Sequence, residues 1–271
     1  MFKEYEQIIH GMADIGKKVR DWRSADNRNK EIINHETLTT IADKKAHFLI
    51  QDLILESFPL DHILSEESEI KNLKPKRYWL IDPIDGTASW LEGFDGYVSQ
   101  ICLIENNEIL FSVIYAPEFD YLWVGMIGQG AYLNGTKLNN ISPVNKVSNF
   151  RLVDNYPEPK NIARKVYDAL SPKYIQSGSL GLKCAMVASG LADLFIKDVM
   201  FRDWDIAPAK LMIQETGAVI VDFKGNEISI NDSHEFSNGL IVARDNFLTD
   251  RILNLIEEIY EKKGFNCSSS S

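Results

Sequence analysis

The chain has 271 residues, 45% of them hydrophobic, so it can bury a large core as one big domain or two modest ones. Acidic residues outnumber basic ones by 39 to 29, and the net charge of −10 argues against a surface for nucleic acid or anionic membranes. The acidity does not exclude phosphorylated substrates, because carboxylates can hold the divalent cations that bind phosphate.

Cysteine usage and the N-terminal residues indicate a soluble, cytoplasmic protein. Cys102, Cys184 and Cys267 lie far apart without metal-ligand spacing, so neither a disulfide framework nor a zinc site is expected. The first ten residues lack the apolar core of a signal peptide. No uncharged apolar run approaches the roughly 18 residues that a membrane span requires.

Two amphipathic helices are predicted at the start of the chain. About the first twenty residues form one, because apolar side chains recur there at helical spacing, at Ile8, Met12, Ile15 and Val19. A second helix is predicted over 40–57, with an apolar side made of Ile41, Leu49, Ile50, Leu53 and Ile54. Thr40 and Asp43 have the spacing of a capping box at its start.

Strands are predicted next, and helices alternate with strands after about residue 145. The segment 77–82 is a short apolar strand, and 97–104 with 108–117 forms a hairpin. Later helices are predicted near 161–170, 180–190, 205–216 and 246–262. This order predicts an α+β or α/β layered sandwich of two α/β subdomains, the first with a mixed, largely antiparallel sheet. The predicted parts are an N-terminal subdomain (1–148), a C-terminal subdomain (149–264) and a disordered tail (265–271).

The most informative segment is 79–87, which reads WLIDPIDGT. An apolar strand delivers two carboxylates, Asp82 and Asp85, at its C-terminal end. Pro83 removes a backbone donor and forces the chain to turn, and Gly86 lets a ligand approach the main chain. The two carboxylates can therefore converge on one hard cation.

The residues that follow suggest a place for phosphate. Thr87 is a suitable N-cap for a helix, and the amides of Gly86 and Thr87 could receive a phosphate at the helix start. An ordinary turn would contain the same residue types, so this segment alone leaves both interpretations open.

Two further acidic features lie elsewhere in the chain. Glu66 and Glu67 follow a short apolar piece, 62–64, that is predicted to be a neighbouring strand end. Asp205 lies in a Trp-Asp-x-Ala segment at the start of a predicted helix, where a carboxylate alone is most often a cap or a helix-terminal charge. The five histidines form no evident site.

Together these three blocks resemble the inositol monophosphatase superfamily of metal-dependent, lithium-sensitive phosphatases. The superfamily is marked by an acidic pair after a strand, then D-P-x-D-G-T, then W-D-x-A, and here these motifs are at 66–67, 82–87 and 204–207. The resemblance covers about residues 5–260 and implies the layered sugar-phosphatase-like fold with the metal site in the N-terminal subdomain. It also implies Mg²⁺ as cofactor, in two or three copies.

The resemblance assigns ligands to these ions. It implies that Glu66, Asp82 and the carbonyl of Ile84 hold one Mg²⁺, and that Asp82, Asp85 and Asp205 hold a second. A third, weaker ion is implied near Glu66. Paired metals suit the hydrolysis of a phosphate dianion, which needs charge neutralisation and an oriented water more than covalent help.

Catalytic roles are implied for Thr87 and Asp43, which resemble the pair that orients the attacking water, with Glu66 beside them. Asp43 is also explained by the capping box, and both roles can hold at once.

The segment 177–184 resembles the glycine-serine stretch that lines the substrate pocket in this superfamily, which implies substrate contacts from Gly178 and Ser179. The form L-K-C-x-x-V-A-x-G around Lys183 is closer to the CysQ-like bisphosphate-nucleotidase branch. Lys197 stands where inositol monophosphatases place a glutamate, and it could attract a second phosphate or a carboxylate. A solvated surface lysine is the equally acceptable alternative.

Other residues favour a different branch. Ala88, Ser89 and Trp90 resemble the inositol and histidinol phosphatases and lack the K-E-F of CysQ-like proteins. We therefore expect a phosphatase acting on inositol phosphate or a related sugar phosphate, with adenosine 3′,5′-bisphosphate as the alternative substrate. A catalytically silent relative that binds metal is the less favoured third reading. The expected partner is a small phosphorylated molecule, with no nucleic acid and no membrane, and a homodimer is possible.

Overall fold

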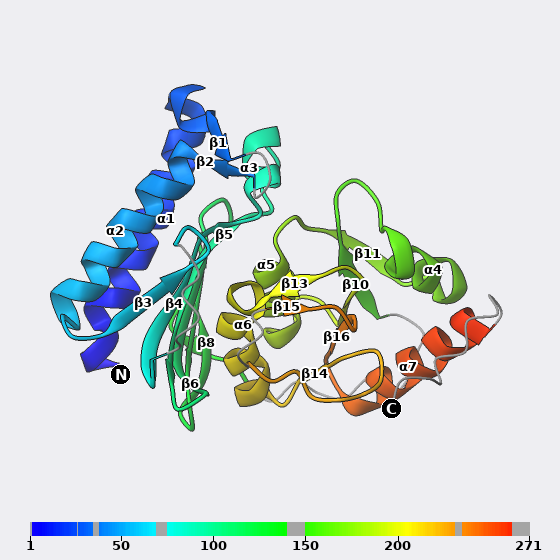
Figure 1. Ribbon diagram of the computed structural model, residues 1–271. Helices are drawn as coiled ribbons and strands as arrows, with labels where there is room; N and C mark the ends of the chain where they lie inside the picture. The colour runs from blue at the N-terminus through cyan, green and yellow to red at the C-terminus, as the bar shows by residue number, and fades with distance from the viewer. Residues whose placement is uncertain are drawn as a thin grey trace.

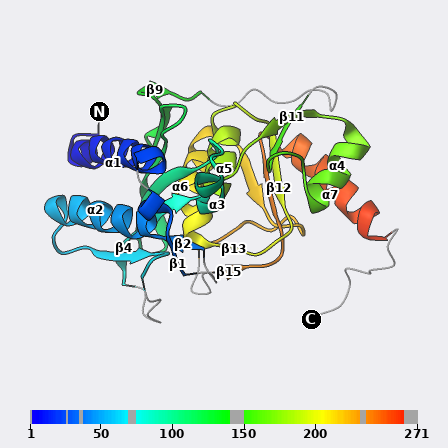
Figure 2. The same ribbon diagram turned by 90° about the horizontal axis from the view of Figure 1, so that it is seen from above.

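Helices and sheets alternate across the molecule in five layers (Figures 1 and 2). The computed structural model describes residues 2–25, 27–34, 38–68, 75–139, 150–230 and 235–261. From one side to the other, a helix pair, a seven-stranded sheet, a second helix pair, a five-stranded sheet and a third helix pair follow one another. Each sheet thus buries both faces against helices.

The seven-stranded sheet holds the strand that delivers the two aspartates. It runs in chain order, parallel between its first two strands and antiparallel thereafter. Its strands are β3 (His62–Ser65), β4 (Arg77–Asp85), β5 (Val98–Glu105), β6 (Glu108–Ala116), β7 (Tyr121–Met126), β8 (Gly130–Leu133) and β9 (Thr136–Lys137). All but the first residue of β4 are buried, as a central strand covered on both faces requires.

Two long helices cover the outer face of this sheet, α1 (Glu6–Ala25) and α2 (Ile41–Ser57), preceded by a 3₁₀ turn (Lys3–Tyr5). Their apolar sides pack on Trp79 and Phe111 of the sheet. The expected capping box is present: Thr40 accepts from the amide of Asp43, and the Asp43 carboxylate accepts from the amide of Thr40. Short segments lead from one helix to the other: a 3₁₀ turn (Asn27–Lys30), β1 (Ile32–Asn34) and β2 (Thr39–Thr40).

The middle layer consists of α5 (Leu180–Ala188) and α6 (Asp203–Thr216), which lie between the sheets and bury nearly every side chain. A short helix, α3 (Thr87–Glu92), leaves the end of β4. The N-termini of α5 and α6 face the end of β4, so all three elements meet at one place.

The five-stranded sheet completes the second half of the molecule. Its order is β11-β10-β12-β16-β14, parallel among the first three strands and antiparallel among the last three. The strands are β10 (Arg151–Asp154), β11 (Lys173–Gln176), β12 (Leu194–Lys197), β14 (Val219–Val221) and β16 (Leu240–Ala243). Its outer face is covered by α4 (Asn161–Leu170) and α7 (Asn246–Glu261), and β13 (Phe201–Arg202) pairs with β15 (Glu235–Phe236) beside it.

The predicted layered sandwich with a largely antiparallel first sheet is confirmed, and the predicted helices lie within a few residues of the observed ones. One local expectation is wrong: the residue that caps α3 is Gly86, not Thr87, which is the first helical residue. Cys102 and Cys184 are buried free thiols, whereas Cys267, the tail and the boundary at 148–149 lie outside the described residues. Within the described chain, no helix combines the length and apolarity needed to cross a bilayer.

Candidate active site

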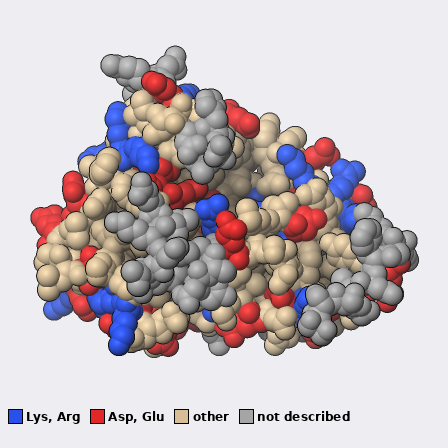
Figure 3. All heavy atoms as spheres, in the orientation of Figure 1, with Lys and Arg blue, Asp and Glu red and all other residues tan. Residues whose placement is uncertain are grey.

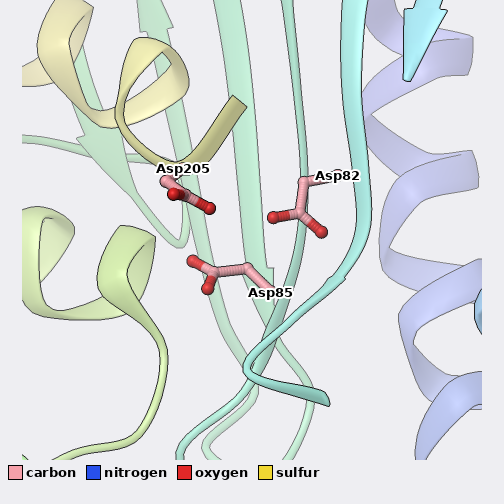
Figure 4. Close-up of side chains that lie close together, drawn as sticks. All are labelled: Asp82, Asp85 and Asp205. Atoms are coloured by element: carbon pink, nitrogen blue, oxygen red, sulfur yellow. The ribbon is translucent and has the colours of Figure 1, made fainter. Parts of the chain in front are cut away.

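Three carboxylates converge where β4 ends and α6 begins (Figure 4). Asp82 and Asp85 come from β4 and Asp205 from the first turn of α6. One oxygen of each lies within 4.8 Å of an oxygen of the other two. Such a group of oxygen ligands suits a hard divalent cation.

A β-bulge puts the two strand carboxylates on one side. Residues three apart in a regular strand point to opposite faces. Here the pairing of β4 with β5 slips between Asp82, opposite Gln100, and Asp85, opposite Val98, so two residues of β4 face one of β5. The hydroxyl of Ser99 closes the bulge by donating to the Pro83 carbonyl at 2.7 Å.

The turn after the bulge requires glycine at residue 86. Gly86 has a φ of +93°, and a side chain there would meet the Gly96 carbonyl and Ser179 at 3.1 and 3.2 Å. The tight turn therefore follows from close packing between the β4 end and the start of α5.

Asp85 is held by donors that come mainly from the distant α5 terminus. Its carboxylate accepts from the Ser179 hydroxyl and the Gly181 amide, each at 2.6 Å, and from the Leu180 amide at 3.2 Å. Gln100 adds a fourth donor at 3.2 Å. These bonds offset the cost of burying the carboxylate and fix its orientation toward the other two aspartates.

Asp82 and Asp205 are oriented differently. Asp205 accepts from the backbone amide of Arg202 at 2.8 Å, so it caps α6 and also faces the cluster. Asp82 is 1% exposed, and its Oδ1 has no hydrogen-bond partner among the described residues. A buried carboxylate oxygen without a donor is costly unless a cation binds there.

Charge repulsion and burial act on the whole cluster. Burial, then the charges of Glu66 and Asp85, raise the pKa of Asp82 well above its usual value. Burial and the charge of Asp85 raise the pKa of Asp205 to about 6. Mutual repulsion therefore opposes the ionisation of these carboxylates, and divalent cations would relieve it.

Glu66 lies outside the group of three but within its electrostatic reach. It follows β3, and its amide donates to the Ile81 carbonyl at 3.2 Å. Burial, followed by the charge of Asp205, raises the pKa of Glu66 to about 8. The structure thus brings four predicted metal ligands into one electrostatic cluster.

Thr87 and Asp43 meet across the interface between α3 and α2. The Thr87 hydroxyl lies 3.1 Å from Asp43 Oδ1 and 3.0 Å from the Ile84 carbonyl, so its single proton has two acceptors. Burial raises the pKa of Asp43 to about 6, although hydrogen bonds from Thr40 oppose the shift. Asp43 therefore serves as capping residue and as partner of Thr87 at once.

A cavity of about 320 Å³ opens beside Asp85 and Asp205. Lys160, Lys183 and Lys197 line it, together with Gly86 and Gly178. In the space-filling view, basic and acidic side chains lie next to one another near the middle of the molecule (Figure 3). Asp154 and Asp198 line the cavity too, so it places lysines and further carboxylates together next to the acidic cluster.

Comparison with known proteins places this architecture in a family. The sequence model described as the inositol monophosphatase family matches residues 3–261. The chain belongs to this family. Its members are phosphoric monoester hydrolases that depend on metal, and they act on small phosphorylated substrates.

Curated relatives within the inositol monophosphatase family match most of the chain. The fructose-1,6-bisphosphatase/inositol-1-monophosphatase of Thermotoga maritima is 28% identical over 244 residues, which cover 90% of this chain and 91% of the relative. Inositol monophosphatase 1 of Sus scrofa is 30% identical over 235 residues, covering 82% of each chain. The Nus factor SuhB of Escherichia coli is 27% identical, covering 81% of this chain and 83% of the relative.

Solved structures of the family share the fold. The inositol monophosphatase of Thermotoga maritima superposes with a TM-score of 0.79 at 25% identity, covering 94% of this chain and 96% of that one. An inositol monophosphatase II from Staphylococcus aureus has a TM-score of 0.77 at 20% identity, covering 94% and 95% of the two chains. At 20% identity the second likeness bears on the fold alone.

Two predicted substrate residues are buried and make contacts within the protein. Ser179 is 1% exposed, and its hydroxyl is directed at Asp85 and not at the cavity. Lys183 is 3% exposed, and its ammonium donates to the Asn155 side chain at 2.6 Å. Burial lowers the pKa of Lys183 to about 8. Both residues therefore belong to the wall of the family's site.

Several residues of the site escaped sequence reasoning. Gln100 and Gly181 hold Asp85, while Asn155 and Lys160 line the cavity with no motif around them. These residues could be found only from contacts between segments that are separated in the chain.

Proposed function

We propose that this protein is a magnesium-dependent phosphatase that hydrolyses a small phosphate monoester, such as an inositol phosphate or a related sugar phosphate. The observation that carries the proposal is the convergence of Asp82, Asp85 and Asp205, with one oxygen of Asp82 lacking a donor among the described residues. A solved relative, an inositol monophosphatase/NADP phosphatase, is complexed with Mg²⁺ and phosphate.

The donor set fits Mg²⁺, because all the converging ligand atoms are oxygens. Asp82, Asp85 and Asp205 would hold one ion, and Glu66, Asp82 and the Ile84 carbonyl would hold another, with a third possible near Glu66. When bound, the ions would lower the pKa of the attacking water and neutralise charge on the phosphate.

Thr87 and Asp43 would orient that water. By donating its proton to Asp43 at 3.1 Å, the Thr87 hydroxyl keeps its lone pairs available to accept a hydrogen bond from water. With a pKa of about 6, Asp43 is ionised at neutral pH and can act as this acceptor. Glu66 is the proposed acceptor of the water's proton, because bound cations would lower its raised pKa and keep it ionised. The amides of Gly86 and Thr87 remain the predicted contacts for the phosphate.

A second candidate substrate, adenosine 3′,5′-bisphosphate or another doubly anionic phosphate, is favoured by the lysines of the cavity. Burial and, to a smaller extent, repulsion from Lys197 lower the pKa of Lys183, while Asp154, 3.9 Å from the Lys183 ammonium, opposes the shift. Two such cations lining one cavity would be stabilised by a second anionic group on the substrate. Inositol 1-phosphate would bring no second anion to these lysines, which share the cavity with the carboxylates of Asp154 and Asp198.

Phosphate release measured with Mg²⁺ and with EDTA tests the proposal. The panel consists of inositol 1-phosphate, fructose 1,6-bisphosphate, histidinol phosphate, adenosine 3′,5′-bisphosphate and sugar 1-phosphates. Release that requires Mg²⁺ supports the mechanism, and the preferred member identifies the substrate. If the protein binds metal but releases no phosphate from any compound of the panel, the interpretation as a catalytically silent relative replaces this proposal.

The proposal also covers the cellular compartment and the oligomeric state of the protein. Cytoplasmic location is supported by the two buried free thiols among the described residues, which fit a reducing compartment. A homodimer is proposed from the family resemblance, and sedimentation velocity would test it.

A further inference from the structure

The turn after β3 carries Glu66, and α2 holds this turn from outside. Ser65 and Glu67 flank Glu66 on either side. His47 Nδ1 lies 3.0 Å from the Ser65 hydroxyl, which also accepts from the Glu67 amide at 3.2 Å. Lys44, one turn before His47, contacts Glu67. The conformation of the Glu66 backbone therefore depends on side chains of α2.

Lys44 makes two contacts with the same residue. Its ammonium donates to the Glu67 backbone carbonyl at 2.8 Å and pairs with the Glu67 carboxylate at 3.0 Å. A single cation that holds both the carbonyl and the side chain of one residue restricts the backbone on the C-terminal side of Glu66. At the other side, the Glu66 amide is fixed to the Ile81 carbonyl.

The pair also balances a buried charge. The Glu67 side chain is 4% exposed, while that of Lys44 is 39% exposed and reaches in from the surface. Without its partner, Glu67 would be a buried carboxylate next to others, because its charge already contributes to the raised pKa values of Glu66 and Asp43. Breaking such a pair is expected to move the turn.

The position of Lys44 in the helix connects two parts of the site. Asp43, its neighbour in α2, contacts the Thr87 hydroxyl at 3.1 Å. Lys44 therefore joins the helix that carries Asp43 to the turn that carries Glu66. A shift of the turn would change the distance between Glu66 and the Thr87–Asp43 pair.

We propose that Lys44 is a positioning residue, whose ion pair with Glu67 holds Glu66 in place for binding the metal ion and orienting the attacking water. The inference rests on the proposed metal-dependent function, and it concerns a residue outside the three motifs. A purely electrostatic role for Lys44 makes the opposite prediction, because removing a cation near acidic ligands should strengthen metal binding.

The test compares Lys44→Met with Lys45→Met, its neighbour on the same helix. Lys45 is directed away from the turn, toward Asn29 and the ring of Trp22, so it is a matched control. Mn²⁺ binding is measured by calorimetry and by electron paramagnetic resonance without substrate. Turnover is then measured as a function of Mg²⁺ and of the best substrate of the panel.

We expect Lys44→Met to raise the Kd for Mn²⁺ by about tenfold or more and to lower kcat by about the same factor, with a smaller change in KM. Lys44→Arg should restore most of both losses, because a guanidinium can donate to the carbonyl and the carboxylate together. Lys45→Met should leave binding and kcat near wild type. Should Lys44→Met fail to fold, Lys44→Gln replaces it with the same expected direction.

A double variant tests whether the two residues act as a unit. If they do, Lys44→Met combined with Glu67→Gln should bind Mn²⁺ no more weakly than Lys44→Met alone. Tighter or unchanged Mn²⁺ binding by Lys44→Met, or additive losses in the double variant, would overturn the inference. Because binding is measured without substrate, a protein that binds Mn²⁺ as expected but hydrolyses nothing would refute only the proposed function.

Discussion

Replacing Asp205 by asparagine separates the effect of the carboxylate cluster on stability from its effect on metal binding. Asp205 accepts a hydrogen bond from the Arg202 amide at 2.8 Å, at the start of α6. Asparagine has almost the same shape and keeps an oxygen that can accept this bond. The substitution therefore removes one charge from the cluster while the cap of the helix is retained.

The size of the effect follows from the pKa of Asp205. Burial and the charge of Asp85 raise it from 3.8 to about 6 in the metal-free protein. Since one pKa unit corresponds to about 1.4 kcal/mol, the ionised carboxylate destabilises the metal-free fold by at most about 3 kcal/mol. The pKa is raised in the folded state, so this destabilisation is absent below the unfolded value of 3.8. It develops as the pH rises and is complete above a pH of about 6.

Thermal and urea unfolding in EDTA, at pH 4.5 and pH 7.5, measure the effect. At pH 7.5 we expect the free energy of unfolding of Asp205→Asn to exceed that of the wild type by about 2–3 kcal/mol, or roughly 4–5 °C in Tm. This advantage should shrink at pH 4.5. Millimolar Mg²⁺ should reverse the order at pH 7.5, because the wild type gains the binding free energy of the ion and the variant has lost a ligand. Phosphatase activity of the variant should fall sharply.

Asp250 provides the control for the loss of one carboxylate. Asp250→Asn, on the exposed side of α7, should change the free energy of unfolding by no more than about 0.5 kcal/mol. If Asp205→Asn in EDTA at pH 7.5 is no more stable than the wild type, the carboxylates do not strain the metal-free fold. The argument that a cation relieves their repulsion would then fail.

Three further predictions concern activity. Thr87→Ala should lower kcat by about a hundredfold or more, with little change in KM. Thr87→Ser should recover most of the rate, and equal rates for the two variants would contradict the role of the hydroxyl. Lys197→Met should reduce the preference for a bisphosphate over the matching monophosphate by about tenfold, measured as a ratio of kcat/KM. Lys173→Met, at an exposed position of β11, should leave this ratio unchanged. Millimolar lithium should inhibit by occupying a magnesium position, as the resemblance implies, and full activity in lithium would contradict this expectation.

The sequence determined those parts of the protein that depend on near neighbours in the chain. The apolar spacing of α1 and the capping box of Thr40 and Asp43 involve residues within one or two turns, and the structure has both. The D-P-x-D-G-T motif and its order among the other acidic blocks were enough to indicate the family, which the comparisons confirm. These signals are readable because each is complete within a few consecutive residues.

Local reasoning was wrong where a distant segment competes for the same group. Thr87 has the right residue type for an N-cap, but Asp43 and the Ile84 carbonyl both accept from its hydroxyl, and the left-handed Gly86 takes the cap position. The substrate contact expected of Ser179 stays a prediction, and its hydroxyl donates to Asp85, 94 positions away.

Only the tertiary structure decided how the site is assembled. The spacing of Asp82 and Asp85 is compatible with opposite faces of a strand, and the bulge against β5 is what places both carboxylates on one side. The donors that hold Asp85 come from the start of α5, 94 to 96 positions away. Lys160 and Lys44, the partner of Glu67, lie outside every motif. Side-chain chemistry can be read from the sequence, but the distances between groups are set by packing between layers that are remote along the chain.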